Sequence, residues 1–287
     1  MNPYIQSIIL GIVEGLTEFL PVSSTAHLRI TEALMNIPLD DAYWKMYTIV
    51  IQLGAILALL LLFLGRIAGF LRNFPSGRNG DRNWLNHPIS LTFIAFACTS
   101  APALLLHKWS EKNLGSLQAM SMALLIGGIA MWIIDAWAAR RESTTLDVEE
   151  MTLPQAIWIG LCQTLSAIFP GTSRSMSTIA AGQLAGLDRP SALEFSFLLS
   201  IPTMVAATCW DLKKEVFPSG GATAHVVMTT DNWIVLIIGT VVSFIVALGV
   251  VEWFLFWVRK HGFTIFAVYR ILLGAALLIW GAKYIGS

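Results

Sequence analysis

Four side chains able to do chemistry lie in one short stretch near the start of the chain. In "EGLTEFLPVSSTAH", the carboxylates of Glu14 and Glu18 are followed by Ser24 and His27. Residues four apart share one face of a helix, so the two carboxylates are expected to lie side by side and to repel one another. A low dielectric constant magnifies this repulsion. We therefore expect the pair to hold a divalent cation, to share a proton or to face a cationic partner.

A hydroxyl and an imidazole follow Pro21 in the same stretch. Ser24 and His27 are three residues apart, so a helix that starts after Pro21 brings the ring toward the hydroxyl, as a general base requires. Residues of these types also occur as helix caps, so the pair alone does not identify an enzyme.

A second stretch, "PGTSRSMST" from Pro170, has the features of an anion site. Ser173 and Ser175 stand at the expected start of a helix, where backbone N–H groups and the helix dipole favour negative charge. Arg174 adds a planar fork of donors suited to phosphate oxygens. Combined with the first stretch, these residues indicate phosphoryl transfer at a membrane.

The composition predicts an all-α integral membrane protein. The chain has 287 residues, of which 56% are hydrophobic and 13% charged, and its mean hydropathy is +0.69. A helix needs about 20 residues to cross the hydrocarbon core. Six apolar segments are expected to span it: residues 46–65, 89–106, 113–134, 195–210, 232–251 and 263–282.

Charge and cysteine content argue against two other classes of protein. Lysine plus arginine equals aspartate plus glutamate at 18 each, so the charge gives no reason to expect nucleic acid as a partner. The three cysteines are single and widely spaced, which fits neither a zinc site nor a disulfide framework.

The two motifs are related by a weak internal repeat. At an offset of 149, Gly11, Glu14, Pro21 and Ser24 fall over Gly160, Gln163, Pro170 and Ser173. Residues 1–142 and 150–287 then each hold a proline-broken segment and three spans. An odd number of crossings per half predicts an inverted-topology repeat. The broken segments, residues 4–22 and 153–171, are expected to form re-entrant hairpins that meet near the midplane.

The lysines and arginines of the loops predict the orientation. Eight fall in polar segments on one side of the inverted arrangement (Arg66, Arg72, Arg78, Arg82, Arg140, Arg141, Arg259 and Lys260), and four fall in loops on the other (Lys108, Lys112, Lys213 and Lys214). The positive-inside rule makes the first side cytoplasmic. Both termini and the first hairpin are then expected to open outward.

The chain resembles the undecaprenyl-diphosphate phosphatase family, also called the bacitracin-resistance family. The segments that carry the resemblance cover nearly the whole chain: "EGLTEFLPVSSTAH", "PGTSRSMST", "VIQLGAILA", "EFSFLLSIP" and "FAVYR". The resemblance implies a multi-pass enzyme of the bacterial inner membrane, with its active site facing the periplasm. It implies that the enzyme removes the terminal phosphate of C55 polyprenyl diphosphate, which recycles the carrier for peptidoglycan synthesis. It also implies a divalent cation, Mg²⁺ or Ca²⁺.

The resemblance also implies roles for particular residues. The acidic motif falls on Glu14 and Glu18, the serine and histidine element on Ser24, Thr25 and His27, and the phosphate motif on Ser173, Arg174, Ser175 and Thr178. Many members have glycine where this chain has Ala26, so the local turn is in question. Gln52, Glu194 and Arg270 lie in family-like segments, either as cavity residues or as structural polar groups.

The hypothesis for the reaction is attack by Ser24 on the terminal phosphorus, with His27 accepting the proton. Arg174 then neutralises the phosphate oxygens, and Glu14 and Glu18 hold the cation. Two alternatives stay open: the histidine is itself the nucleophile, or Glu18 is the base for Ser24.

A rival function and one question of assembly also stay open. Inverted repeats with broken helices are typical of transporters, so a flippase for the lipid monophosphate is the alternative function. A homodimer is compatible with the glycine-rich span "LLIGGIAMW", because small residues permit close approach of helices. The same glycines are compatible with packing inside one chain.

Overall fold

The computed structural model describes residues 1–113, 116–216 and 228–281, and helices dominate the described part. In chain order they are α1 (Pro3–Thr17), α2 (Ser24–Leu34), α3 (Ala42–Arg72), α4 (Pro88–Asn113), α5 (Leu117–Ala138), the 3-10 turn η1 (Val148–Glu150), α6 (Leu153–Ile168), α7 (Arg174–Leu184), α8 (Arg189–Val216), α9 (Thr230–His261), α10 (Thr264–Ala276) and the π-helical turn η2 (Leu277–Gly281). The prediction of an all-α fold is confirmed.

Five helices in the described residues are long and apolar enough to cross a membrane, namely α3, α4, α5, α8 and α9. They coincide with five of the six predicted spans and make the chain a multi-pass membrane protein. The sixth prediction, residues 263–282, differs. Its α-helical part, α10, is only 13 residues long and passes into η2, and residue 282 lies outside the described residues.

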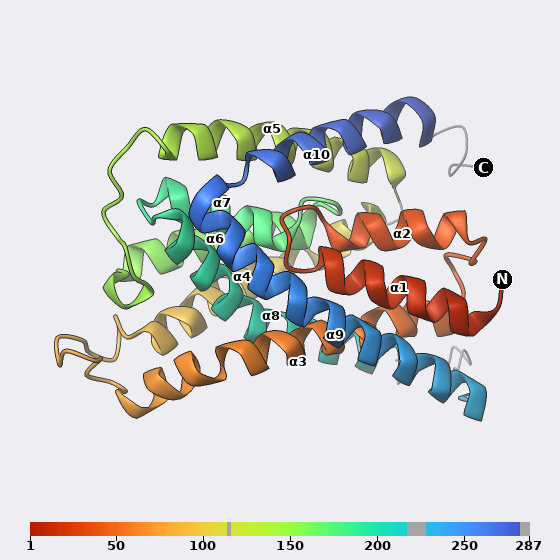
Figure 1. The fold of residues 1–287 in the computed structure, drawn as a ribbon, viewed down its shortest axis with the longest axis horizontal. Helices are drawn as coiled ribbons and strands as arrows, with labels where there is room; N and C mark the ends of the chain where they lie inside the picture. Colours follow the sequence, from red (N-terminus) through yellow and green to blue (C-terminus); the bar gives the residue numbers. More distant parts are fainter. Residues whose placement is uncertain (114–115, 217–227, 282–287) are drawn as a thin grey trace.

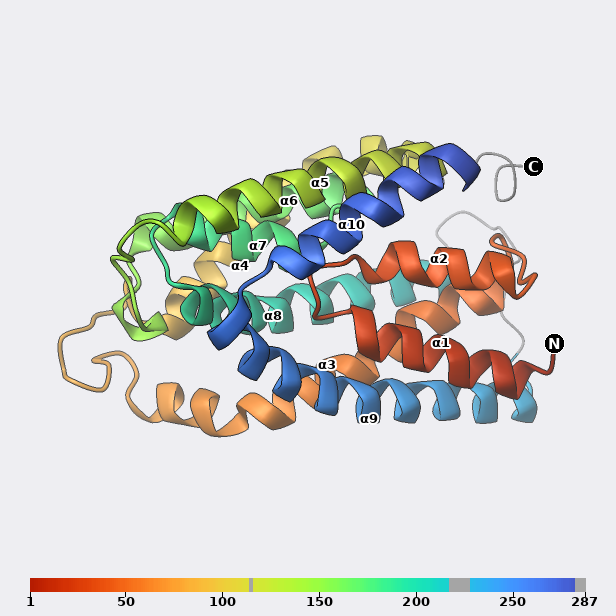
Figure 2. The same cartoon turned by 45° about the horizontal axis from the view of Figure 1, so that its top comes forward.

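Two hairpins break the membrane fold where proline was expected to break it. α1 ends at Thr17 and α6 at Ile168, shortly before Pro21 and Pro170, because proline lacks the N–H that a continuing helix needs. The pairs α1–α2 and α6–α7 enter from opposite ends of the long axis, and their turns lie near the middle (Figures 1 and 2).

The second helix of each hairpin begins at a serine with an unusual backbone. Ser23 is the N-cap of α2 with φ of 76°, and Ser173 is the N-cap of α7 with φ of 70°. This left-handed region is rare for residues other than glycine. The equivalence therefore pairs Ser23 with Ser173, which corrects the predicted pairing of Ser24 with Ser173 by one residue. The reason is one additional residue between Pro170 and its N-cap.

Each hairpin packs against a span from the other half of the chain. α1 lies along α9, and α6 lies along α4. Glycine permits both approaches: a Cβ placed on Gly11 lies 2.7 Å from the carbonyl oxygen of Gly239, and one on Gly160 lies 2.8 Å from the Cα of Ala95. Each half of the chain thus provides the helix against which the hairpin of the other half packs. The inverted relation of the two halves stays a prediction.

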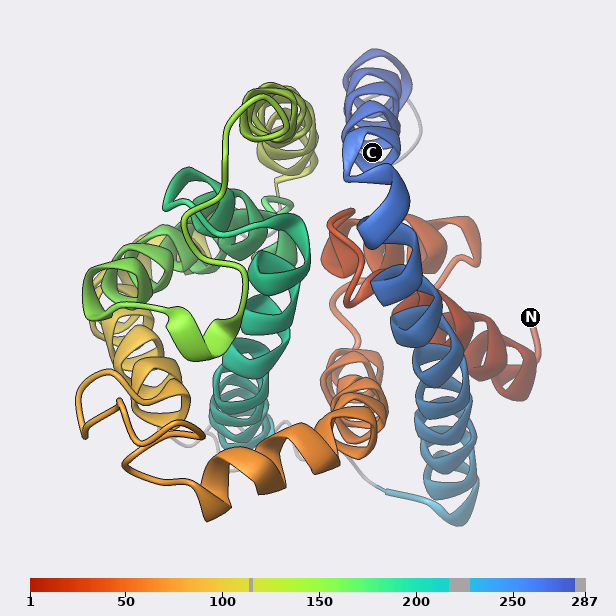
Figure 3. The same ribbon diagram turned by 60° about the vertical axis from the view of Figure 1, so that its left-hand side comes forward.

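The span α5 of the first half and the shorter helix α10 of the second half also pack together (Figure 3). The glycines of the "LLIGGIAMW" segment lie in this contact. A Cβ on Gly127 lies 2.6 Å from a guanidinium nitrogen of Arg270, and one on Gly128 lies 2.9 Å from the carbonyl oxygen of Ala267. These glycines therefore serve packing inside one chain.

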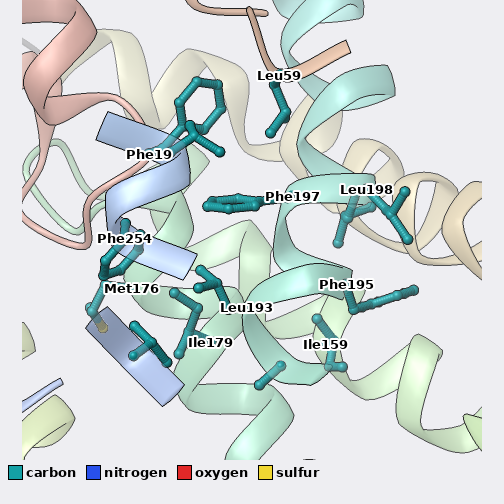
Figure 4. Packing of buried hydrophobic residues seen from close by; sticks show 14 of the residues in the cluster. Phe19, Leu59, Ile159, Met176, Ile179, Leu193, Phe195, Phe197, Leu198 and Phe254 are labelled. Atoms are coloured by element: carbon teal, nitrogen blue, oxygen red, sulfur yellow. The ribbon is translucent and has the colours of Figure 1, made fainter. Parts of the chain in front are cut away.

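An aromatic core holds the first turn against the spans. Phe197 of α8 packs edge-on against Phe19, at a ring-centroid distance of 5.5 Å, and against Phe63 of α3, at 5.8 Å. Figure 4 shows Phe197 among Phe19, Leu59 and Leu193. Because Phe19 directly follows Glu18, this packing fixes the carboxylate next to it.

The approach of α6 to α4 predicts the effect of a single methyl group. Gly160→Ala is expected to lower the stability of the protein by about 1–3 kcal/mol, because the new Cβ overlaps the backbone of Ala95. Thermal unfolding in detergent measures the change. Gly65→Ala is the matched control, since a Cβ there has no neighbour within 4 Å. Equal unfolding temperatures for the two variants would contradict the close contact.

Candidate active site

A cavity of about 440 Å³ lies where the two hairpin turns meet. Six of the predicted site residues line it: Glu14, Glu18, Ser24, Thr25, Ser173 and Arg174. They come from both hairpins, although about 150 residues separate the two motifs in the sequence. The structure therefore brings the acidic motif and the phosphate motif into one site.

The shortest polar contact in this cavity joins Ser24 to Glu18. The Ser24 hydroxyl donates to Glu18 Oε2 at 2.5 Å. Glu18 caps the end of α1 and Ser24 is the first residue of α2, so the reversal of the chain within six residues creates the pair. A carboxylate in this position is placed to accept the serine proton.

His27 does not contact Ser24 as predicted. Its Nδ1 lies 2.7 Å from the carbonyl oxygen of Ser23, to which it donates, and its Nε2 lies 2.6 Å from the hydroxyl of Tyr269. The rings of His27 and Tyr269 are also stacked, with centroids 5.6 Å apart. Both ring nitrogens are thus occupied, and His27 is not among the residues that line the cavity. The expected approach of the imidazole to the hydroxyl is wrong, whereas a catalytic role for His27 stays a prediction.

Arg174 connects the second hairpin to the first. One guanidinium nitrogen, Nη2, lies 3.3 Å from Glu18 Oε1. The other, Nη1, is buried and has no hydrogen-bond partner in the described part of the chain. Arg174 is also the first residue of α7, where backbone N–H groups are free to bind an anion. Arg174 lines the cavity, and an unpaired guanidinium donor suits a phosphate oxygen.

Glu14 is a buried hydrogen-bond acceptor that lacks a donor within the described ranges of the chain. Its side chain is 1% exposed, and neither carboxylate oxygen has a hydrogen-bond partner among the described residues. A buried carboxylate in this state requires a proton or a cation. The described residues contain no group of three or more histidine, cysteine, aspartate or glutamate side chains arranged to hold a metal ion. Among those residues no third side chain of these types joins the two glutamates, so Glu14 and Glu18 alone stay the predicted protein ligands of a cation.

Two residues of the predicted phosphate motif point away from the cavity. The Ser175 hydroxyl donates to the carbonyl oxygen of Leu20, at 3.0 Å, and the Thr178 hydroxyl lies 2.6 Å from that of Ser196. Both are buried, and neither lines the cavity. Ser175 joins α7 to the first turn and Thr178 joins it to α8, so the prediction of phosphate contact by these two side chains is not met.

The glycine usual in the family is not needed at Ala26. This residue is fully buried inside α2, and the residue with positive φ is Ser23. The substitution therefore leaves the turn unaffected.

Arg270 is a structural residue that supports both turns. It is fully buried, and its guanidinium donates to the carbonyl oxygens of Pro21 (3.2 Å), Gly171 (3.2 Å), Thr172 (2.9 Å) and Ala123 (3.1 Å). The first acceptor belongs to one hairpin and the next two to the other. Arg270 does not line the cavity, and its role follows from contacts that no sequence spacing reveals.

Other polar residues line the cavity besides the predicted ones. Gln52 lines the cavity, but Glu194 does not. Glu194 forms an ion pair with Arg66 instead, with 2.7 Å between Oε1 and Nε. Seven further polar residues line the cavity and were not predicted: Ser23, Arg29, Glu32, Thr48, Ser166, Thr203 and Asp211. The one available signal was a pair of charges, Arg29 and Glu32, directly after the first motif.

Loss of the Arg270 donors is expected to weaken the junction of the two turns. Arg270→Met keeps much of the side-chain volume but leaves buried carbonyl groups unpaired, which is expected to cost about 2–4 kcal/mol of stability. Arg72→Met, at the exposed end of α3, is the control. Thermal unfolding in detergent compares the two. Equal unfolding temperatures would show that the carbonyl contacts do not hold the hairpins together.

Comparison with known proteins places the chain in one family. The family model described as bacitracin resistance protein BacA matches residues 7–276. A relative from Koribacter versatilis named undecaprenyl-diphosphatase is 58% identical over 99% of this chain and 100% of its own length. Relatives with the same name from Caldanaerobacter subterraneus and Clostridium tetani are 39% and 41% identical, over 99% and 96% of this chain and 98% and 95% of their own lengths. The chain belongs to the bacitracin resistance protein BacA family.

Proposed function

We propose that this protein hydrolyses undecaprenyl diphosphate to undecaprenyl phosphate and inorganic phosphate. The observation that carries the proposal is the contact of Ser24 with Glu18 beside the unpaired Nη1 of Arg174. The site thus combines a nucleophile, a proton acceptor and a phosphate-binding donor in one cavity. The names of the full-length relatives support the same substrate. The reaction recycles the lipid carrier for peptidoglycan synthesis and accounts for bacitracin resistance.

In the proposed reaction Ser24 Oγ attacks the terminal phosphorus, and its proton passes to Glu18. The bond from phosphorus to the bridging oxygen breaks, undecaprenyl phosphate leaves, and the proton on Glu18 passes to it. Water then attacks the phosphoserine and gives one proton to Glu18. The bond between phosphorus and Ser24 Oγ breaks, inorganic phosphate leaves, and Glu18 passes the proton to Oγ, which restores Ser24. The 2.5 Å contact favours Glu18 over His27 as the proton acceptor.

Arg174 and the start of α7 stabilise the charge that develops on the transferred group. The free Nη1 and the first N–H groups of the helix donate to the non-bridging oxygens. Ser173 lines the same part of the cavity. The contact of Arg174 Nη2 with Glu18 also keeps the proton acceptor in place.

A divalent cation, Mg²⁺ or Ca²⁺, fits beside Glu14, the carboxylate that the proposed proton transfers do not use. Glu14 and Glu18 would hold it, because the oxygens of Glu14 are buried without a partner and carboxylates are the ligands these ions prefer. When bound, the cation supplies positive charge that neutralises the diphosphate.

The proposed location is the inner membrane, with the cavity open to the periplasm. Thr48, near the start of α3, and Asp211, near the end of α8, line the cavity. The cavity thus extends toward the helix ends that are expected to be outside, which supports this proposal. The opposite side carries eight loop lysines and arginines against four. Of those four, the side chains of Lys108, Lys112 and Lys214 lie outside the described residues. A homodimer stays a prediction, since Gly127 and Gly128 pack inside the chain.

Transport of the lipid phosphate is a second candidate function. Each hairpin packs against a span from the other half of the chain, and the cavity lies where the two hairpin turns meet. This arrangement is found in transporters. A flippase needs an anion site but no nucleophile, so hydrolysis without a second compartment distinguishes the two functions.

Phosphate release from undecaprenyl diphosphate by the purified protein in detergent micelles is the decisive measurement. Hydrolysis is expected, and Ser24→Ala is expected to lower it at least about 10³-fold, because the attacking atom is lost. Ser121→Ala is the matched control: it removes a buried hydroxyl that, among the described residues, donates to Leu117 of its own helix. Absence of phosphate release by the unmodified protein would overturn the proposal. Full activity of Ser24→Ala would instead remove Ser24 from the mechanism.

The cation is tested through Glu14. Glu14→Gln is expected to raise the Mg²⁺ or Ca²⁺ concentration needed for half-maximal activity about tenfold or more, because one anionic ligand becomes neutral. Titration of the chelator-treated enzyme with either ion measures this. Glu252→Gln, on an exposed position of α9, is the control. Unchanged activity after chelation would contradict a role for the cation.

A further inference from the structure

A second cavity lies toward the end of the long axis where α5 and α9 end, away from the proposed active site at the hairpin turns. Its volume is about 250 Å³, and it lies between the end of α5, the junction of α7 with α8 and the end of α9. This end of the molecule comes forward in Figure 3. The polar residues that line it are Arg141, Ser143, Gln183, Asp188, Arg189 and Arg259. None of them belongs to the hydrolytic site.

The cavity has an excess of positive charge. Arg189 is neutralised by the buried Asp135, with contacts of 2.8 and 3.1 Å. Arg141 and Arg259 are exposed, and in the described part of the chain neither forms an ion pair. Asp188 is the one carboxylate among the lining residues. Two guanidinium groups, one from the loop after α5 and one from α9, thus line one cavity with a single opposing charge, which favours an anion.

The same cavity also offers hydrogen-bond acceptors. Gln183 is 2% exposed, and its Nε2 donates to Asp135 at 2.9 Å. Its Oε1 is buried without a partner among the described residues. Asp188 Oδ1 accepts from the backbone N–H of Ser191 and leaves its second oxygen available. A ligand that satisfies the cavity therefore carries hydroxyl groups as well as negative charge.

The side chains around the cavity are those of a membrane interface. The Arg141 guanidinium lies 4.3 Å from the ring centroid of Trp137, and the Lys260 ammonium lies 4.3 Å from that of Phe256. Cations and aromatic rings in such pairs gather where hydrocarbon meets water. Trp137, Trp253 and Phe256 are exposed, and they offer apolar surface for acyl chains close to the charges.

We propose that this cavity binds the headgroup of an anionic glycerophospholipid. The phosphate lies between Arg141 and Arg259, and a headgroup hydroxyl donates to Gln183 Oε1. Phosphatidylglycerol has this chemistry, since it combines one negative charge with two hydroxyl groups. A free phosphate ion shares the charge but makes no use of the exposed aromatic surface beside the cavity. Basic pockets between helices at the cytoplasmic side are a known mode of lipid binding.

The test measures lipid binding to the full-length protein by native mass spectrometry, with phosphatidylglycerol and phosphatidylcholine as probes. Preferential binding of phosphatidylglycerol is expected. The double variant Arg141→Gln with Arg259→Gln is expected to weaken it about tenfold or more, since each cation contributes to attraction of an anionic headgroup. Arg72→Gln with Arg140→Gln is the matched control, because it removes the same charge from two exposed residues that do not line the cavity. Equal losses in both double variants, or no preference over phosphatidylcholine, would overturn the proposal.

Two further measurements separate the sources of the anion and the role of the cavity. Asp188→Asn keeps an oxygen for the Ser191 N–H and removes the opposing charge, so binding is expected to tighten about threefold. Inorganic phosphate at millimolar concentration is expected to leave the lipid bound. Displacement of the lipid by phosphate would assign the cavity to a free anion, and weaker binding by Asp188→Asn would contradict the proposed position of the headgroup.

Discussion

The hydrogen bonds of Arg270 to both hairpin turns are the contacts on which the rest of the structure depends. A chain that breaks its helices inside a membrane leaves carbonyl groups without donors, and hydrocarbon supplies none. Here one buried guanidinium bonds to Pro21 on one side and to Gly171 and Thr172 on the other. Gly127 leaves the space that the guanidinium occupies. The two turns are therefore held in one place, and everything in the cavity is positioned relative to them.

A single carboxylate then links the chemistry of the two hairpins. Glu18 receives the Ser24 hydroxyl from its own hairpin and a guanidinium nitrogen of Arg174 from the other. Ser24 and Arg174 occupy equivalent positions, as the first residues of α2 and α7. The same local geometry thus presents a hydroxyl from one half and a cation from the other. The two positions are alike in backbone and differ in side chain, and this difference provides the nucleophile on one hairpin and the phosphate-binding group on the other.

The parts of this arrangement that follow from local sequence could be predicted. Pro21 and Pro170 identified the breaks, apolar length identified five spans, and helix spacing identified Glu14 and Glu18 as neighbours. The position of His27 could not be predicted, because it depends on Tyr269, which is 242 residues away. Helical spacing brings the ring toward Ser24 only if no other partner competes. The predicted phosphate contacts of Ser175 and Thr178 are absent for the same reason. The Ser175 hydroxyl bonds to the first turn and the Thr178 hydroxyl bonds to α8.

The packing of α1 along α9 also has a consequence for biosynthesis. The ribosome delivers the first hairpin long before the helix that packs against it, because α9 follows α1 by more than 200 residues and ends at His261. Contacts between such distant segments form late, because the intervening chain must be in place first. The α1–α2 hairpin, which carries Ser24, therefore gains its packing against α9 only after the ribosome has delivered that helix.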